Sequence, residues 1–223
     1  MIDAIKEQIL TASNSLGMQL SDNKVALLAE YLLMMNKRNK VYNLTAVRTV
    51  NEMISHHIVD SLSVLLPLQR VIQATSLDST IPINILDVGS GAGLPGVVIA
   101  ICFPEYSVHC LDAVAKKMAF VRQVAATLDL KNLAALHSRV ETVTTQYSVI
   151  TSRAYASLID FVSGSSNALS SQGVWMAMKG KIPLNEIENL PNNIDMFHVE
   201  QIHVPGLEAE RCIVWMKKRM DIV

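Results

Sequence analysis

Several features that would point to a particular compartment or partner are scarce in this sequence. It has three cysteines, Cys102, Cys110 and Cys212, and no CxxC spacing. This excludes a disulfide scaffold and favours buried free thiols. The longest unbroken apolar run, 97–103, is far shorter than the roughly 20 residues that cross a bilayer, and the first residues lack the apolar core of a signal peptide. We therefore expect a cytoplasmic protein without a membrane segment.

Charge of one sign is not in excess either. The chain has 19 Lys and Arg against 20 Asp and Glu, a formal net charge of −1. Near-neutrality argues against a protein that coats nucleic acid through bulk electrostatics, but it leaves room for a local basic patch. Half of the 223 residues are hydrophobic and 17% are charged, so the chain can bury a sizeable core.

The apolar pattern changes in character along the chain. Residues 1–72 predict an N-terminal helical cap: a helix over 2–15, one that follows Ser21 and ends in the basic run 37–40, and one from a capping box at Thr49 to Pro67. Residues 80–223 alternate strands with helices, which predicts an α/β core with a mostly parallel sheet and a C-terminal antiparallel hairpin, packed with the cap as one unit. The strands are expected at 83–88, 107–111, 134–137, 148–151, 174–178 and 212–217, with helices at 94–103 and 115–128.

A glycine-rich stretch, DVGSGAGLPG (87–96), follows the first predicted strand. Gly89, Gly91 and Gly93 lack a Cβ, so they can adopt positive φ and let a ligand approach the backbone closely. The helix that begins near Pro95 directs its N–H groups toward the same point. This arrangement predicts a nucleotide-like ligand at the carboxyl end of the strand, although a tight turn with close strand–helix packing would use glycines too.

Acidic residues near this stretch distinguish among possible ligands. A phosphate-binding P-loop needs Gly-Lys-Ser/Thr, which is absent here. Asp87 would repel the pyrophosphate of a dinucleotide, but it suits the cationic amino-acid end of S-adenosylmethionine. Asp112, at the end of the second predicted strand, can accept hydrogen bonds from both ribose hydroxyls, cap the following helix, or do both. A ribose site without a pyrophosphate site favours S-adenosylmethionine.

Six motifs along the chain, taken together and in this order, carry a family resemblance. They are YNLTAVR (42–48), HHIVDSL (56–62), DVGSGAGLPG (87–96), SRVE (138–141), SRAYASL (152–158) and MKGK (178–181). The chain resembles, over nearly its whole length, the bacterial 16S rRNA guanine-N7 methyltransferase G family, also called glucose-inhibited division protein B. The resemblance implies a Rossmann-like methyltransferase fold, S-adenosylmethionine as cofactor, and N7 of a guanine in a decoding-region loop of 16S rRNA as acceptor. The substrate would be the rRNA within the small ribosomal subunit or an assembly intermediate.

The resemblance and the residues together give an expected cofactor site. The motifs contribute Gly89, Leu94, Val140, Glu141 and Arg153. With the loop and the acidic residues, the set is Asp87, Gly89, Gly91, Gly93, Leu94, Asp112, Val140, Glu141 and Arg153. The family often has Gly-Lys-Arg where this chain has Ala115-Lys116-Lys117, which keeps the positive charge but puts bidentate contacts in doubt.

The implied acceptor agrees with the residue types. A loop for methylating an exocyclic amine usually contains proline, and residues 151–154 contain none. Guanine N7 carries no proton, so positioning and electrostatics suffice and no general base is needed. Guanine O6 and N7 are acceptors, so Arg139 and Lys179 are expected to position the substrate as donors. The expected RNA-binding residues are Lys116, Lys117, Arg122, Arg139 and Lys179. Lys37, Arg38 and Lys40 could widen this basic face or be ordinary surface charges.

Two other functions remain open from the residues alone. An NAD-type Rossmann oxidoreductase would use the glycine loop, but Asp87 disfavours it. A non-catalytic rRNA-binding assembly factor would keep the basic residues and would not need the glycine loop. His56 and His57 have no accompanying cluster of ligand-type residues, so we expect them to pack or hydrogen-bond within the cap, and we expect no metal.

Overall fold

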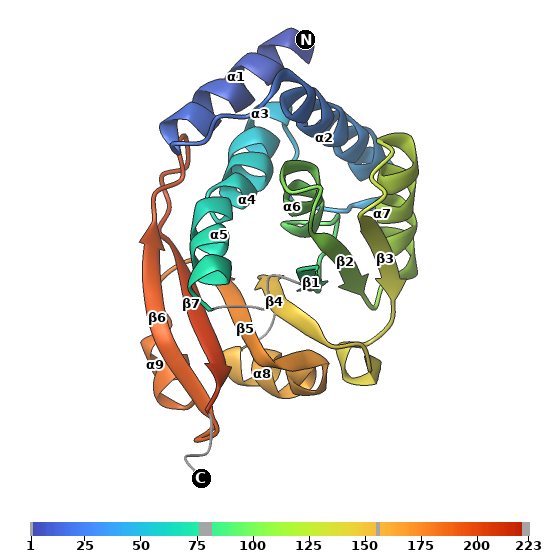
Figure 1. Ribbon diagram of the computed structural model, residues 1–223. Coiled ribbons are helices and arrows are strands. Elements are labelled where there is room, and N and C mark those ends of the chain that lie inside the picture. Colours follow the sequence, from blue (N-terminus) through green and yellow to red (C-terminus); the bar gives the residue numbers. More distant parts are fainter. Residues whose placement is uncertain (1, 76–81, 155–156, 220–223) are drawn as a thin grey trace.

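The computed structural model describes residues 2–75, 82–154 and 157–219, and within them a single seven-stranded sheet lies between two layers of helices (Figure 1). The strand order is β3-β2-β1-β4-β5-β7-β6; β1 to β5 are parallel, and β7 is antiparallel to both β5 and β6. The strands are β1 Asn84–Val88, β2 Ser107–Asp112, β3 Leu133–His137, β4 Tyr147–Arg153, β5 Leu169–Lys179, β6 Ile194–Ile202 and β7 Arg211–Lys218. The predicted α/β class and its antiparallel C-terminal end are confirmed.

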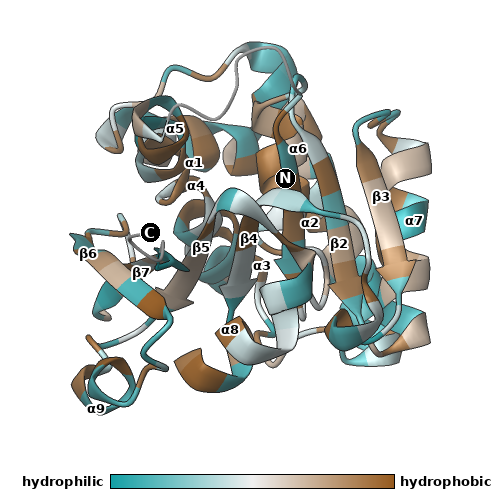
Figure 2. Cartoon of the chain, turned by 60° about the horizontal axis from the view of Figure 1, so that its bottom comes forward, coloured by the Kyte–Doolittle hydropathy of each residue, from teal (hydrophilic) through white to brown (hydrophobic). Residues whose placement is uncertain are grey.

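Both faces of the sheet are buried because side chains of alternate residues along each strand enter two separate hydrophobic clusters. Ile85 and Val149 belong to the larger cluster, with α6 (Gly96–Cys102), α7 (Ala115–Thr127) and the N-terminal helices. Leu86 and Ile150 belong to the smaller one, with the 3-10 turn η2 (Val140–Thr142), α8 (Leu158–Ser165), the 3-10 turn η3 (Ser166–Ala168) and α9 (Leu184–Glu188). A parallel sheet covered on both sides has near-continuous apolar strands. Figure 2 shows this as brown, hydrophobic colour along the strands and α6.

The N-terminal helices are α1 (Ile2–Ser15), α2 (Asp22–Tyr42), α3 (Val50–Met53), the π-helical segment η1 (Ile54–Val59), α4 (Asp60–Leu62) and α5 (Leu65–Ala74). The capping box is present, because Thr49 accepts from the Glu52 N–H and Glu52 accepts from the Thr49 N–H. The prediction that this helical stretch ends at Pro67 is wrong. Pro67 lies in the first turn of α5, where an N–H has no intrahelical partner and proline is therefore tolerated.

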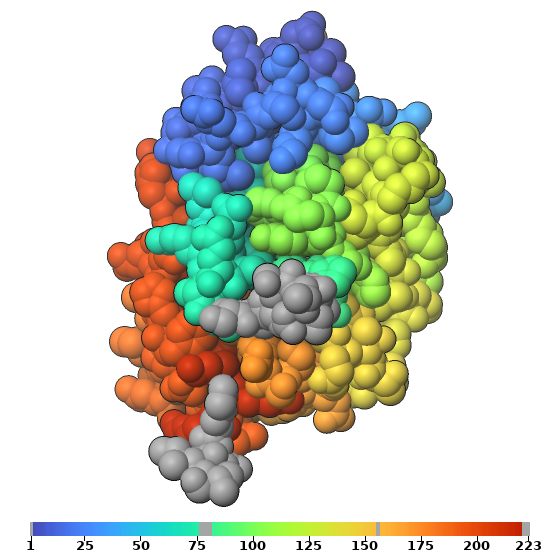
Figure 3. All heavy atoms as spheres, in the orientation of Figure 1, coloured from blue at the N-terminus to red at the C-terminus, as the bar shows by residue number. Residues whose placement is uncertain are grey.

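The N-terminal helices pack directly on the sheet layer. In Figure 3 their blue atoms lie against the green atoms of the α6 region without an intervening gap. Two hydrogen bonds reach across: the Tyr31 hydroxyl donates to the Ala92 carbonyl at 2.9 Å, and Lys24 Nζ donates to the Cys102 carbonyl at 2.6 Å. Helix α2 therefore supports the glycine loop. The predicted boundary between cap and core falls partly within 76–81, outside the described residues, and that division stays a prediction.

Strand β6 and helices α8 and α9 were not predicted. Strand β6 forms the edge of the sheet and is mostly half-buried or exposed, so polar residues interrupt its apolar pattern. It extends the predicted antiparallel end, since the outer hairpin is formed by β6 and β7. The expectation of buried free thiols is confirmed for Cys102, Cys110 and Cys212.

Candidate active site

Two cavities meet at Gly89, at the carboxyl edge of the parallel strands. The first, about 530 Å³, lies between the loop after α2, the η1 segment, the glycine loop and the ends of β4, β5 and β7. The second, about 410 Å³, lies between the ends of β1 and β2 and the SRVE motif. Open α/β sheets bind ligands at this edge. The two cavities share Gly89 in their walls, and together they form the candidate site.

The structure brings most of the expected site residues to these cavities and leaves others outside them. The first cavity is lined by Gly89, Gly91, Leu94, Arg153 and Lys179. The second is lined by Gly89, Asp112, Lys117, Arg139, Val140 and Glu141. Asp87, Gly93, Lys116 and Arg122 line neither one.

Asp112 joins the glycine loop to the start of α7. Its Oδ2 accepts from the Gly91 N–H at 3.1 Å and from Lys117 Nζ at 3.3 Å, and its Oδ1 accepts from the Val114 N–H at 2.9 Å. The side chain is almost fully buried and borders the second cavity. The carboxylate thus anchors the loop and the helix start, and its place beside the cavity is the place expected for a ribose contact.

Two of the loop glycines are required for different physical reasons. Gly91 has φ +61°, and a Cβ built on it would meet no atom within 4 Å, so this position opens on free space. Gly93 has φ +98°, and its Cβ would come within 2.5 Å of Val97 Cγ2. Gly91 therefore borders open space, and its place in the cofactor site stays a prediction, whereas Gly93 allows the loop to pack closely on α6.

Asp87 supports the loop from behind. The residue is fully buried, and its Oδ2 accepts from the Gly96 N–H at 2.8 Å at the first residue of α6. Its Oδ1 has no hydrogen-bond partner among the described residues. Burial raises the pKa of this carboxyl to about 7. In this structure the carboxyl holds the loop against α6, and direct contact with a cofactor stays a prediction.

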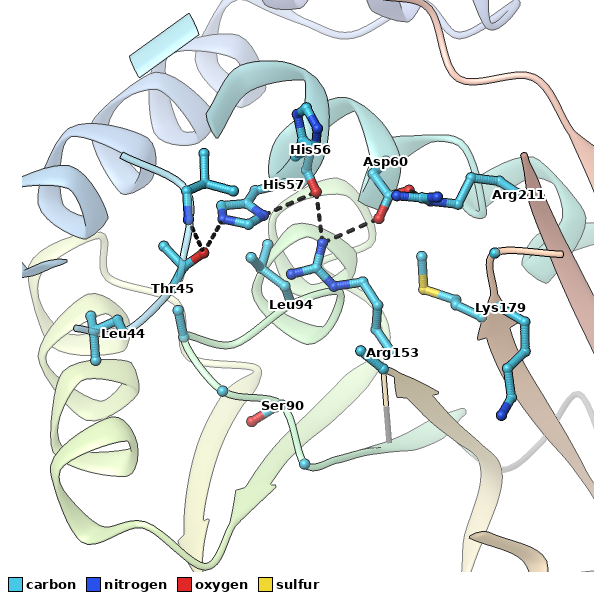
Figure 4. A pocket seen from close by; sticks show the side chains of 17 residues that line it. Leu44, Thr45, His56, His57, Asp60, Ser90, Leu94, Arg153, Lys179 and Arg211 are labelled. Carbon is cyan, nitrogen blue, oxygen red and sulfur yellow. Dashed lines mark hydrogen bonds and ion pairs between the residues drawn. The ribbon is translucent and has the colours of Figure 1, made fainter. Parts of the chain in front are cut away.

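A buried carboxylate organises the cations of the first cavity (Figure 4). Arg153 donates to Asp60 Oδ2 at 3.1 Å and to the His56 carbonyl at 2.8 Å. Arg211 Nε donates to Asp60 Oδ1 at 2.7 Å. We did not identify Arg211 from the sequence, where its one signal was an arginine just before a predicted strand.

His57 is buried beside this network and is held by two hydrogen bonds. Its Nε2 lies 2.7 Å from Thr45 Oγ1, and its Nδ1 lies 2.9 Å from the His56 carbonyl oxygen. Burial, with the nearby Arg153 charge, lowers the pKa of His57 to about 4. The ring is therefore neutral at neutral pH and is a weak base. No three His, Cys, Asp or Glu side chains among residues 2–75, 82–154 and 157–219 are grouped so as to hold a metal ion.

Lys179 lies at the rim of the first cavity, at the end of β5. Its Nζ is 2.9 Å and 3.2 Å from the two oxygens of Glu186 in α9. Glu186 also accepts from the Leu158 N–H, at the start of α8, at 2.6 Å. Figure 4 shows the amine of Lys179 directed away from Arg153. Sequence reasoning missed Glu186, which fixes this amine in the structure.

Comparison with known proteins identifies the family. The model of the family described as rRNA small subunit methyltransferase G matches residues 24–214. The chain belongs to the rRNA small subunit methyltransferase G family. It is 55% identical over 212 residues to Ribosomal RNA small subunit methyltransferase G of Polaromonas sp. (strain JS666 / ATCC BAA-500), covering 95% of this chain and 93% of that relative. It is 56% identical over 207 residues to the same-named protein of Albidiferax ferrireducens, covering 91% and 92%. Membership of the family confirms the predicted enzyme class, a methyltransferase with S-adenosylmethionine as cofactor.

Solved structures show that this family member has the methyltransferase fold. TrmN from Thermus thermophilus superposes with a TM-score of 0.53 at 16% identity, over 71% of this chain and 53% of that one. Coclaurine N-methyltransferase, bound to N-methylheliamine and SAH, superposes with a TM-score of 0.56 at 10% identity, over 97% and 87%. These similarities concern the fold alone. No helix in the described part of the chain is both long enough and apolar enough to cross a membrane.

Proposed function

We propose that this protein transfers the methyl group of S-adenosylmethionine to N7 of a guanine in 16S rRNA, in a decoding-region loop. The observation that carries the proposal is the pair of cavities on either side of Gly89. One is lined by the Asp112 carboxylate, which could accept hydrogen bonds from a ribose. The other presents cations whose carboxylate neighbour, Asp60, is already paired twice. The names of the relatives support small-subunit rRNA as the substrate.

The second cavity is the proposed site of the adenosine part of the cofactor. Asp112 would accept hydrogen bonds from the ribose hydroxyls, and Val140 and Glu141 would contact the adenine. Gly91 and Leu94 would line the path of the amino-acid end into the first cavity, where the space beside Gly91 is free of protein atoms. The cofactor, when bound, supplies a sulfonium with an electrophilic methyl group.

The first cavity is the proposed site of the guanine. N7 has no proton to lose, so the protein needs donors that orient the base and no group that removes a proton. Asp60 is the single carboxylate among the described residues that line this cavity, and two guanidinium groups neutralise it. With its low pKa and both ring nitrogens occupied, His57 is also a poor base. The residues therefore favour direct in-line transfer.

The basic residues around the site are proposed to hold the RNA. Lys179 at the first cavity and Arg139 at the second would position the substrate, and Lys117 would accompany them. Lys116 and Arg122 are exposed on α7, where they could meet only RNA that extends beyond the cavities. We propose that the substrate is rRNA within the small ribosomal subunit or an assembly intermediate, and that the reaction takes place in the cytoplasm.

The test is methyl transfer to small ribosomal subunits from cells that lack the protein. With radiolabelled cofactor, we expect one methyl group per 16S rRNA. Borohydride and aniline should then cleave the strand at the modified position, because N7 methylation labilises the guanine ring. Label without cleavage would indicate another acceptor atom. Binding to the subunit without label would favour the assembly-factor alternative, and binding of NAD in place of S-adenosylmethionine would favour the oxidoreductase.

A further inference from the structure

The cations of the chain are unevenly distributed. Between Glu30 and Glu52 there is no Asp or Glu, and the range 37–48 contains four Lys and Arg. The remaining 15 Lys and Arg against 20 Asp and Glu give the rest of the chain a formal charge of −5. A positive segment in an otherwise acidic protein attracts a polyanion to one place without making the whole surface adhesive.

These cations gather on the exposed side of the last turns of α2 and on the loop that follows. Asn39 is the buried residue of these turns, and the residues around it lie on the side of the helix that faces away from the core. The Arg38 guanidinium lies over the Tyr42 ring at 4.6 Å from its centre, Tyr42 is 36% exposed and Val41 is 69% exposed. We call this set the α2-end surface; it consists of Lys37, Arg38, Lys40, Val41, Tyr42 and Arg48.

The four cations of the α2-end surface are not neutralised by the protein. In the described part of the chain, no ion pair involves them. Arg48 donates to the neutral Asn43 side chain at 3.0 Å. Glu52, the carboxylate that follows them in sequence, is engaged in the capping box with Thr49. Their charge is therefore available to an external anion.

Asn39 fixes the α2-end surface relative to the first cavity. Its Nδ2 donates to the Val47 carbonyl at 2.9 Å, and its Oδ1 accepts from the Thr45 N–H at 2.9 Å. Thr45 and Val47 both line the cavity, and Thr45 is also bonded to His57. The surface and the cavity wall are thus parts of one hydrogen-bonded unit, and a strand bound to one is held at a set distance from the other.

We propose that the α2-end surface binds the single-stranded RNA that flanks the target base, with the cations on its phosphates and Tyr42 stacked on one of its bases. This inference rests on the proposed function, which supplies the RNA. Exposed aromatic rings beside Lys and Arg are the combination that single strands engage, because the cations follow the backbone and the ring stacks on a base. The surface acts as a second anchor outside the cavity, and it sets which stretch of the strand can place its guanine at Arg153 and Lys179.

The test compares two double variants by direct RNA binding. Lys37→Gln/Lys40→Gln removes two charges from the surface. The control, Lys131→Gln/Arg219→Gln, removes two exposed charges from the opposite end of the sheet, before β3 begins and after β7 ends. Binding of a 16S rRNA stem–loop that contains the target guanine is measured by fluorescence anisotropy across a salt series, and cofactor affinity is measured by calorimetry.

We expect the dissociation constant for RNA to rise about 25-fold at ~0.1 M salt in the surface variant, and the slope of log Kd against log salt to fall by about 1.4, since each phosphate contact to a single strand contributes about 0.7. The control should change by less than about twofold, and cofactor affinity should not change in either. Equal RNA binding by the two variants would overturn the inference.

Stacking by Tyr42 is tested separately, by comparing two substitutions of this residue. Tyr42→Ala should weaken RNA binding at least about fivefold, and Tyr42→Phe should keep it, because the ring and not the hydroxyl stacks. If both variants weaken RNA binding equally, the proposal that Tyr42 stacks on a base is contradicted. If the wild-type protein methylates rRNA and the lysine double variant binds RNA as tightly as the wild type, this inference is contradicted and the proposed function is not. If the wild-type protein binds RNA through the α2-end surface and does not methylate it, the proposed function is contradicted and this inference is not.

Discussion

The Asp60 carboxylate accepts a hydrogen bond from Arg211 at 2.7 Å and so joins the N-terminal helices to strand β7, 151 residues further along the chain. The other oxygen of the same carboxylate binds Arg153, at the end of β4. The Asp60 side chain is only 3% exposed, and it is the carboxylate partner of both guanidinium groups. The position of the two cations in the site is thus decided by a residue outside the sheet.

Replacing this carboxylate should be costly. Asp60→Asn leaves two guanidinium groups beside a neutral amide, and breaking a buried pair from one side costs about 3–5 kcal/mol. We expect the free energy of unfolding, measured by urea denaturation, to fall by about that amount. Asp195→Asn, which breaks a partly exposed pair with Lys217, should cost less than about 1 kcal/mol. Similar losses in the two variants would show that Asp60 is not a structural anchor.

The glycine loop can be tested with two substitutions that separate ligand space from packing. Gly91→Val should abolish binding of S-adenosylmethionine in a protein that still folds, because its side chain enters the open space and its φ is positive. Gly93→Ala should instead lower the melting temperature, since its Cβ would collide with Val97. Calorimetry and thermal unfolding of both variants provide the readouts. A folded Gly91→Val protein with unchanged affinity would place the cofactor elsewhere.

Cofactor binding and RNA handling should be separable at Asp112 and Lys179. Asp112→Ala should weaken S-adenosylmethionine binding by about 1–3 kcal/mol, the value of a hydrogen bond to a charged group. Lys179→Ala should leave that affinity unchanged and reduce kcat/KM for the rRNA substrate. Calorimetry for the cofactor and steady-state kinetics for the RNA make the comparison. If both variants lose cofactor affinity equally, the proposed division of roles is wrong.

The raised pKa of Asp87 predicts a pH dependence of stability. The ordinary pKa of an Asp side chain is 3.8, and that of Asp87 in the folded protein is about 7. Between these two pH values the folded protein holds the Asp87 proton and the unfolded chain does not. Stability from this group is therefore present at low pH and lost as pH rises through that interval, by up to about 4 kcal/mol. Asp87→Asn keeps the acceptor for Gly96 and should remove this loss. Urea denaturation from pH 4 to 7 should show the wild type losing stability relative to the variant, and parallel curves would contradict the assignment.

Methyl transfer itself should be nearly independent of pH. The acceptor has no proton, so the transfer requires no base. The pKa of His57 is lowered to about 4, and Asp87, whose pKa is raised to about 7, lines neither cavity. Single-turnover rates at saturating RNA and cofactor should be flat from about pH 6 to pH 8. A tenfold rise per pH unit at saturation would show that a base takes part and would contradict transfer to N7.

Much of the fold and part of the site follow from the sequence alone, because local chemistry determines them. Alternate glycines after a buried strand require the loop that the structure shows, and Asp112 follows the next strand at the spacing of a βαβ unit. The apolar period separates helices from strands, and the capping box at Thr49 is satisfied by residues three apart. Each of these signals depends on neighbours in the chain.

The rest was decided by tertiary packing. Asp87 and Asp112 both stand at strand ends, yet α6 buries the first completely and leaves the second beside a cavity. Arg211 enters the site because β7 inserts antiparallel beside β5. The sequence did not predict β6, because a strand at the edge of a sheet need not be apolar. Asn39 connects the α2-end surface to the cavity wall through hydrogen bonds to a loop, and a loop has no hydrophobic periodicity from which these contacts could be predicted. A hydrophobic pattern reports which face of an element is buried, whereas contact between distant polar side chains depends on how those faces are placed against each other.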